Sequence, residues 1–152
     1  MRRAWIAVAY FGLLCGALTA HAGEKSCTLQ ISGNDIMQYD KTELRVAADC
    51  TQVTLTLRHT GKLPAQTMGH TWVLTAAADM QGVLNAGLSA GVANNYVPPK
   101  DPRVIAATRI VGGGQSTSVT FATRVLKKGG DYSYFCSFPG HAALMKGKLI
   151  FG

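Results

Sequence analysis

The sequence has 152 residues, with 15 lysines and arginines against 8 acidic residues, so its formal net charge is +7. This charge favours acidic or neutral partners at first encounter. The basic residues are scattered and do not alternate with aromatic ones, which excludes the pattern of a nucleic-acid-binding groove.

The first 22 residues have the pattern of a secretory signal peptide. A short basic head precedes an apolar run of 17 residues, and Ala20-His21-Ala22 has the small-x-small form of a cleavage site. A retained membrane anchor is the alternative, because 17 residues approach the minimum for a membrane span. The cleavage site favours the leader. We therefore predict a signal peptide at residues 1–22 and a single exported domain at residues 23–152, with no stable membrane association after cleavage.

The cysteine count predicts one free thiol. Three cysteines follow the leader, and an odd number in an exported protein indicates either an intermolecular link or a thiol with a role of its own. Cys27 and Cys50 each border a strand-like segment in the N-terminal part, so we predict a disulfide between them. It closes a loop of about 24 residues and contributes roughly 3.5 kcal/mol in the chain-entropy model. Cys136 then remains free for chemistry.

Alternation of apolar and polar residues predicts an all-β fold. In residues 52–59, Val53, Leu55 and Leu57 share one face and polar residues share the other. The other predicted strands are residues 27–32, 43–48, 70–75, 103–111, 117–123, 131–137 and 146–151. About eight short strands separated by glycine- and proline-bearing turns predict an antiparallel β-sandwich with Greek-key connections.

One segment departs from the strand pattern. Residues 76–91 place Met80, Leu84 and Leu88 at helical spacing, although two glycines weaken a helix there. We predict one short helix packed outside the sandwich, followed by a turn-rich return. A catalytic lid is the less favoured alternative.

A thiol, an imidazole and a thioether occur within ten residues near the C-terminus. His141 lies in the loop between two predicted strands, and Cys136 and Met145 stand at the strand ends that border this loop. A neighbouring strand end could supply His70 to the same point. Two imidazoles, one thiolate and a thioether are the ligands of a blue-copper electron-transfer centre. Structural zinc sites usually have paired spacings such as C-x-x-C, and this sequence has none. The pattern therefore predicts one copper ion that alternates between Cu(I) and Cu(II).

A thiol hydrolase is the competing hypothesis, with Cys136 as a nucleophile activated by His141. Such enzymes need a group that orients the imidazole and an oxyanion hole beside a substrate cleft. Phe135 and Phe138 flank the thiol, and no Asn or Asp stands nearby. We rank this hypothesis below copper. His59 is interpreted as a packing residue.

Several stretches resemble the azurins, a family of small periplasmic blue-copper proteins. They include "GNDIMQYD" at residues 33–40, "MGHTWVLTAAADMQG" at 68–82 and "YFCSFPGHAALMKG" at 134–147. The resemblance runs from about Cys27 to the C-terminus. Its spacing C-x4-H-x3-M is more specific than the ligand set alone, because other small blue-copper families space these ligands differently.

The resemblance implies an eight-stranded, cupredoxin-like Greek-key sandwich with an external helical flap and the Cys27–Cys50 disulfide. Strong copper ligands would be His70, Cys136 and His141. Weak axial donors would be Met145 and the carbonyl oxygen of Gly69.

Two positions depart from the usual azurin pattern. Thr71 follows the first histidine ligand, where azurins commonly have asparagine, and Ala107 replaces a frequent non-ligand histidine. The backbone N–H of Thr71 remains available to the thiolate sulfur. The resemblance does not imply that the Thr71 side chain replaces any brace that the asparagine side chain makes in azurins.

Five donor groups around the copper leave no strong coordination position open for a substrate. We therefore predict a periplasmic carrier of single electrons that catalyses no bond chemistry. Its expected partners are small redox proteins such as c-type cytochromes, copper or haem reductases, or periplasmic dehydrogenases, met transiently by a monomer. The residues expected around the copper end, as an apolar docking patch, are Leu63, Met68, Leu88, Phe138, Pro139, Gly140, Ala143 and Leu144. For Leu63 and Leu88 an ordinary core position is the alternative.

Overall fold

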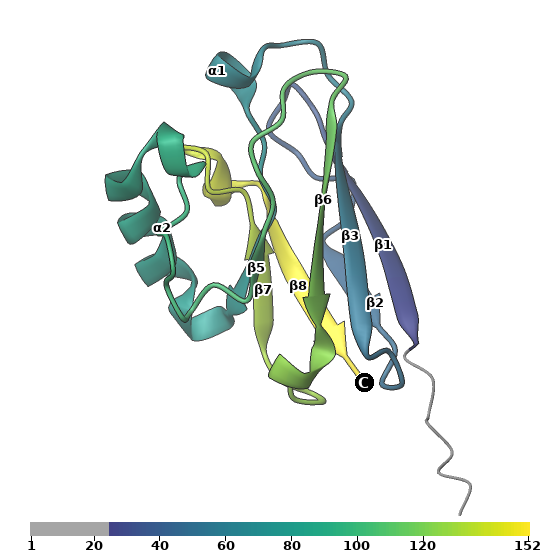
Figure 1. Ribbon diagram of the computed structural model, residues 1–152. Coiled ribbons are helices and arrows are strands. Elements are labelled where there is room, and N and C mark those ends of the chain that lie inside the picture. Colours follow the sequence, from purple (N-terminus) through teal and green to yellow (C-terminus); the bar gives the residue numbers. More distant parts are fainter. Residues whose placement is uncertain (1–24) are drawn as a thin grey trace, which may run out of the picture.

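The computed structural model describes residues 25–152, so the predicted leader lies outside the described residues. Two sheets pack face to face (Figure 1). The three-stranded sheet has the order β1 (Ser26–Gly33), β3 (Gln52–His59), β6 (Ser116–Ala122). The five-stranded sheet has the order β2 (Glu43–Val46), β8 (Lys146–Phe151), β7 (Tyr132–Phe135), β4 (Val73–Ala76), β5 (Ala106–Ala107). The predicted all-β sandwich is confirmed.

Short helices connect the strands. They are α1 (Ala65–Met68), α2 (Met80–Ala90) and four 3-10 turns, namely η1 (Ala77–Asp79), η2 (Val92–Asn94), η3 (Thr123–Val125) and η4 (His141–Ala143). None of the helices between residues 25 and 152 is long and apolar enough to cross a membrane.

The sandwich is not wholly antiparallel, which corrects one expectation. Strands β1 and β3 pair in parallel, and so do β2 and β8. The cause is the path of the chain: β1 and β3 belong to one sheet and the intervening β2 to the other. Because the chain crosses between the sheets twice, β3 returns beside β1 in the same direction.

The core lies between the sheets, as the alternation predicts. Val53, Leu55 and Leu57 of β3 are fully buried, and the next inward position is His59, which is also buried. From the opposite sheet, the Trp72 ring packs beside Tyr134 with ring centroids 5.9 Å apart. The period-two pattern therefore identified the inward face of β3 correctly.

The predicted helix is confirmed and covers the outer face of the five-stranded sheet (Figure 1). Val83 of α2 packs with Val73 and Phe135 in a second apolar cluster. Gly87 is also buried, and a side-chain carbon there would lie 2.2 Å from the carbonyl oxygen of Tyr96, so glycine permits the return segment to approach. This packing supports a structural cover rather than a lid.

Strand β5 is shorter than the predicted strand at residues 103–111. Only Ala106–Ala107 forms regular pairs with β4. Beyond it, the Thr108 side chain accepts a backbone N–H, and the N–H of Ile110 donates to the side chain of Asn95. Side-chain hydrogen bonds thus interrupt the regular ladder, although backbone bonds from Thr108 to Trp72 and between His70 and Val111 continue it. Hydrophobic alternation does not report this competition.

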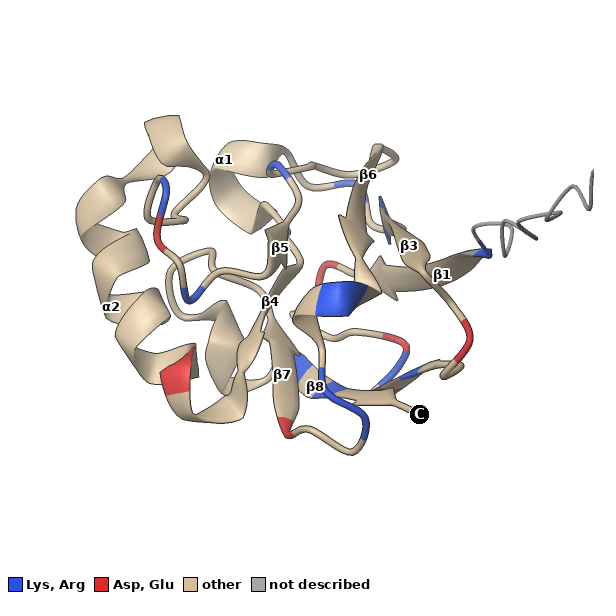
Figure 2. Ribbon diagram, turned by 60° about the horizontal axis from the view of Figure 1, so that its bottom comes forward, with Lys and Arg blue, Asp and Glu red and all other residues tan. Residues whose placement is uncertain are grey.

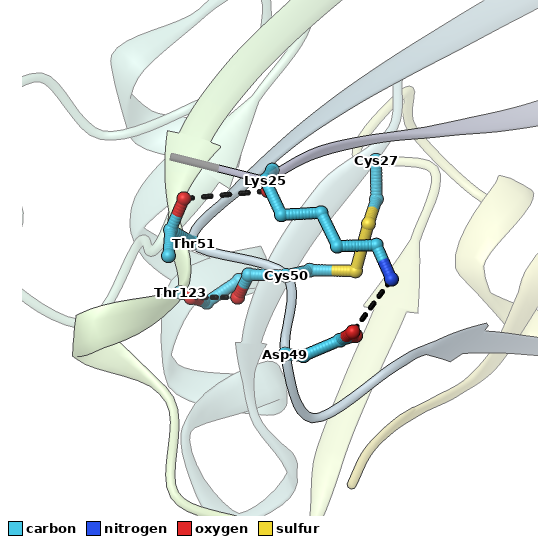
Figure 3. Close-up of a disulfide and its surroundings, with 6 residues drawn as sticks. All are labelled: Lys25, Cys27, Asp49, Cys50, Thr51 and Thr123. Atoms are coloured by element: carbon cyan, nitrogen blue, oxygen red, sulfur yellow. Dashed lines mark hydrogen bonds and ion pairs between the residues drawn. A yellow bond between two sulfur atoms is a disulfide. The ribbon is translucent and has the colours of Figure 1, made fainter. Parts of the chain in front are cut away.

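The predicted disulfide joins Cys27 to Cys50, with the two Cα atoms 5.9 Å apart (Figure 3). Around it, Lys25 pairs with Asp49, and the Thr123 hydroxyl donates to the carbonyl oxygen of Cys50 (Figure 3). The bridge lies near the start of β1, so it stands at the opposite end of the sandwich from Gly33, where β1 ends.

Candidate metal centre

The loop between β7 and β8 carries three of the expected ligands. Cys136 follows β7 directly, and Met145 directly precedes β8. The N–H of Cys136 donates to the carbonyl oxygen of Met145 over 3.0 Å, and the N–H of Met145 donates to that of His141 over 2.8 Å. The antiparallel pairing of the two strands therefore closes the ten-residue loop and brings its ends together.

His70 comes from a different part of the chain, between α1 and β4. A two-way backbone bridge to Val111 fixes its position. The donor atoms of His70, Cys136 and His141 all lie within 4.8 Å of one another. Their exposed fractions are 0%, 0% and 3%, so the three form a buried group that His141 brings nearest to the surface.

The ring of His70 is oriented by the backbone. Its Nε2 lies 2.9 Å from the carbonyl oxygen of Asn34, so the Nε2–H donates there and the Nδ1 lone pair remains for a metal. Gly33 permits the ring to sit so close to β1. A side-chain carbon at Gly33 would lie 2.6 Å from His70 Cδ2.

The two weak donors predicted from the resemblance border the same point. Met145 is fully buried. Its methyl carbon lies beside the His70 ring, 3.0 Å from the position that a side-chain carbon at Gly33 would take. The carbonyl oxygen of Gly69 lies 3.1 Å from His70 Nδ1 and 3.9 Å from Cys136 Sγ. The Gly69 carbonyl oxygen therefore adjoins two of the three strong donors, and the Met145 methyl group adjoins the ring of one of them.

Thr71 supports the thiol in two ways. Its backbone N–H lies 3.4 Å from Cys136 Sγ, as expected. Its hydroxyl oxygen accepts the N–H of Ser137 over 2.8 Å and lies 2.9 Å from the Ser137 hydroxyl. The Thr71 side chain thus braces the segment that bears His70 against the segment that bears Cys136. The resemblance did not imply this brace.

Burial sets the charge state of the donors. It lowers the pKa of His70 and lowers that of His141 to about 4, and the neighbouring His59 adds to both shifts. Both imidazoles are therefore neutral at pH 7 and keep a lone pair. Burial raises the pKa of the Cys136 thiol, opposed by the backbone N–H groups of Thr71 and Phe138. A metal that binds there must displace the thiol proton.

The donor set fits copper better than the alternatives. A soft thiolate and thioether suit Cu(I), and imidazole also suits Cu(II). Within residues 25–152, the metal-binding group contains no carboxylate. A thiol hydrolase would need a cleft open to substrate at Cys136, and this thiol is fully buried.

Sequence reasoning missed the contribution of His59. Its ring stacks on that of His70, with centroids 4.2 Å apart and planes inclined by 12°. The N–H of Gly61 donates to its Nδ1 over 3.0 Å, and its Nε2–H donates to the carbonyl oxygen of Met68 over 2.8 Å. The packing interpretation was right about burial but omitted the contact with a ligand. The inward register of β3 was the available signal.

The predicted patch is mostly exposed. Leu63, Leu88 and Leu144 have exposed fractions of 39%, 53% and 63%, so Leu63 and Leu88 are not core residues. Pro139, Gly140 and Ala143 are also exposed, whereas Met68 and Phe138 are half-buried. The Phe138 ring centroid lies 4.6 Å from that of His141. Three further exposed apolar residues, Ile36, Val92 and Val125, were not predicted.

Comparison with known proteins gives consistent matches. Residues 25–152 match the family described as copper binding proteins, plastocyanin/azurin family. Azurin-1 of Alcaligenes xylosoxydans xylosoxydans is 57% identical over 123 residues, covering 81% of this chain and 95% of its own. Azurin of Pseudomonas aeruginosa strain PAO1 is 46% identical over 149 residues, covering 98% of each.

A solved structure is similar as well. It is the azurin Az-iso2 of the obligate methylotroph Methylomonas sp. strain J, with a TM-score of 0.80 and 43% identity. The match covers 83% of this chain and 98% of that one.

The fold and the buried His-Cys-His group define a small copper protein of the β-sandwich class. The chain belongs to the plastocyanin/azurin family of copper-binding proteins, and the relatives named above are azurins. It is accordingly a blue-copper electron carrier, with His70, Cys136 and His141 as its metal-binding group.

Proposed function

We propose that this chain carries single electrons in the periplasm, through copper held strongly by His70, Cys136 and His141, with Met145 and the Gly69 carbonyl oxygen as weak axial donors. The copper supplies a centre that gains and loses one electron without leaving its ligands. The observation that carries the proposal is the convergence of three buried donors within 4.8 Å, beside a buried thioether.

The chain's part is to hold one arrangement for both oxidation states. The carbonyl of Asn34 orients one imidazole, and the Thr71 N–H and hydroxyl hold the segment that bears the thiol. Burial of Cys136 excludes water from the sulfur. Because five donors would surround the metal, no strong position remains for a substrate, and we propose no bond chemistry.

Two observations support a periplasmic location. A stable disulfide is typical of exported proteins. The match to the azurin of Pseudomonas aeruginosa spans 149 residues, more than the 130 that follow residue 22, so it extends into the predicted leader. We therefore keep residues 1–22 as a proposed signal peptide and residues 23–152 as the proposed exported domain.

We propose that electrons pass through the patch formed by Leu63, Met68, Leu88, Phe138, Pro139, Gly140, Ala143 and Leu144. His141 is the ligand nearest this surface and contacts Phe138. A small apolar surface suits brief docking with redox proteins such as c-type cytochromes, copper or haem reductases, or periplasmic dehydrogenases. A monomer with transient contacts fits this use.

The test places a charge on the patch. Met68→Lys should leave the absorption spectrum nearly unchanged and slow electron self-exchange markedly, because docking two copies would bring two like charges together. High salt should restore part of the rate. Gln30→Lys adds the same charge at an exposed position in β1 and should leave self-exchange close to wild type. Equal rates in both variants would show that electrons do not pass through this face.

A further inference from the structure

A cavity whose lining includes none of the metal donors lies between the return segment that follows α2 and the region of β5. Its volume is about 400 Å³, and its lining includes Asn95, Lys100, Thr108 and Arg109. Figure 2 shows charged positions in the connection between α2 and β5. A cavity of this size lies within the range that small ligands occupy.

The unpaired charge on this cavity is positive. Lys100 and Arg109 are exposed, and neither forms an ion pair within residues 25–152. The one acidic lining residue, Asp101, is held by Arg103 through contacts of 2.9 and 2.6 Å between their side chains. Two cations therefore remain for an incoming anion.

The lining also includes the neutral side-chain amide of Asn95. The Oδ1 of Asn95 accepts the N–H of Ile110 over 2.9 Å, which fixes the amide and leaves its NH₂ group without a partner among the described residues. The backbone is left-handed at Asn95, Tyr96 and Lys100, with φ of 56°, 53° and 57°. Asn95 ends the 3-10 turn η2 in this conformation, which asparagine adopts readily, whereas it is less common for tyrosine and lysine.

We propose that this cavity binds a small organic oxyanion, one that carries phosphate or carboxylate groups. Lys100 and Arg109 neutralise its charge, and guanidinium and amide N–H groups fit the oxygens of these anions. With about 30 Å³ for each displaced water, the cavity has room for an organic body as well as the charged group.

The cavity wall is connected to the metal-binding thiol. The hydroxyl of Ser137 donates to the carbonyl oxygen of Asn95 over 3.0 Å, and the N–H of Ser137 donates to the hydroxyl oxygen of Thr71. The N–H of Thr71 in turn contacts Cys136 Sγ. The oxidised metal centre carries one more positive charge than the reduced centre. The oxidised protein should therefore bind the anion in this cavity more tightly than the reduced protein. By reciprocity, the anion should favour oxidation.

The experiment titrates the reduced, copper-loaded protein with sodium phosphate, glucose 6-phosphate and citrate. Amide NMR spectra are recorded, with sodium chloride added as a control at equal ionic strength. We expect saturable shifts of the Asn95 side-chain NH₂ and of the Lys100 and Arg109 amides, with Kd on the order of 1 mM. Shifts that chloride reproduces, or that do not saturate, would show general screening and overturn the proposal.

Variants locate the site. Arg109→Gln and Lys100→Gln should each weaken binding by at least about threefold, because each removes a cation from the lining. Lys148→Gln removes the same charge from β8, outside this cavity, and should not change Kd. Equal weakening by all three substitutions would point to net charge and overturn the assignment. Repeating the titration on the oxidised protein, with binding monitored by absorption, tests the coupling between anion binding and oxidation state. Equal affinities in the oxidised and reduced proteins would refute this coupling.

Discussion

Replacing Thr71 by valine isolates the side-chain brace of the metal centre. Valine keeps the branched shape and the backbone N–H that contacts Cys136, and it removes only the hydroxyl. That hydroxyl is fully buried and accepts the N–H of Ser137, which is itself only 4% exposed. We expect a clear loss of stability with the copper site still assembled.

The magnitude follows from the hydrogen bonds that are lost. A buried donor left without a partner costs about 1–3 kcal/mol, and a hydrogen bond contributes about 1 kcal/mol net. The Ser137 hydroxyl keeps the carbonyl of Asn95 as a partner. The Ser137 N–H loses its acceptor, and Cys136 Sγ loses its weaker 3.8 Å contact with the Thr71 hydroxyl. Together these give a loss of about 2–3 kcal/mol, which lowers Tm by roughly 6–12 °C for a domain of this size.

Thr75→Val is the matched control in β4. The Thr75 hydroxyl is fully buried, and no hydrogen-bond partner for it lies within residues 25–152. Its removal should therefore be neutral or stabilising. Urea unfolding and thermal melts of the metal-free and copper-loaded proteins measure both variants. The reasoning fails if Thr71→Val is as stable as wild type, or if Thr75→Val loses as much.

Three further predictions concern the disulfide, the axial sulfur and a surface ion pair. Replacing Cys27 and Cys50 by alanine should lower stability in urea unfolding by about 2–5 kcal/mol, with the blue colour retained in the folded protein. Met145→Leu should raise the reduction potential measured by voltammetry while copper stays bound, because loss of a weak axial donor favours Cu(I); copper loss would contradict this. Arg103→Gln should raise the pKa of Asp101 from about 2 towards its ordinary value in a carboxyl NMR titration, since the guanidinium is the main cause of the lowering. Because the folded-state pKa is lowered, this ion pair stabilises the fold above about pH 4, and that contribution should disappear as the pH falls through about 2; an unchanged Asp101 titration would refute the assignment.

Local patterns predicted most of the fold and the identity of the donors. Alternation in β3 identified its inward face, and cysteine parity identified the disulfide. The parallel pairing of β1 with β3 was missed, because it depends on which sheet the intervening strand joins. No local pattern encodes that choice.

The surroundings of the donors were harder to predict. His59 stacks on His70, and the carbonyl of Asn34 orients that ring. Asn34 acts through its backbone, so its side chain gives no signal. The brace from Thr71 to Ser137 joins segments 66 residues apart, and only the folded arrangement shows that a threonine can make it.

The absorption spectrum of the copper-loaded protein, recorded before and after addition of ferricyanide, tests the central claim most directly. Ferricyanide should produce an intense blue thiolate-to-Cu(II) band, and ascorbate should abolish it reversibly. In Cys136→Ser the band should be absent at equal copper content. A blue band that persists in Cys136→Ser, or that never forms in the wild-type protein with copper bound, would contradict the account.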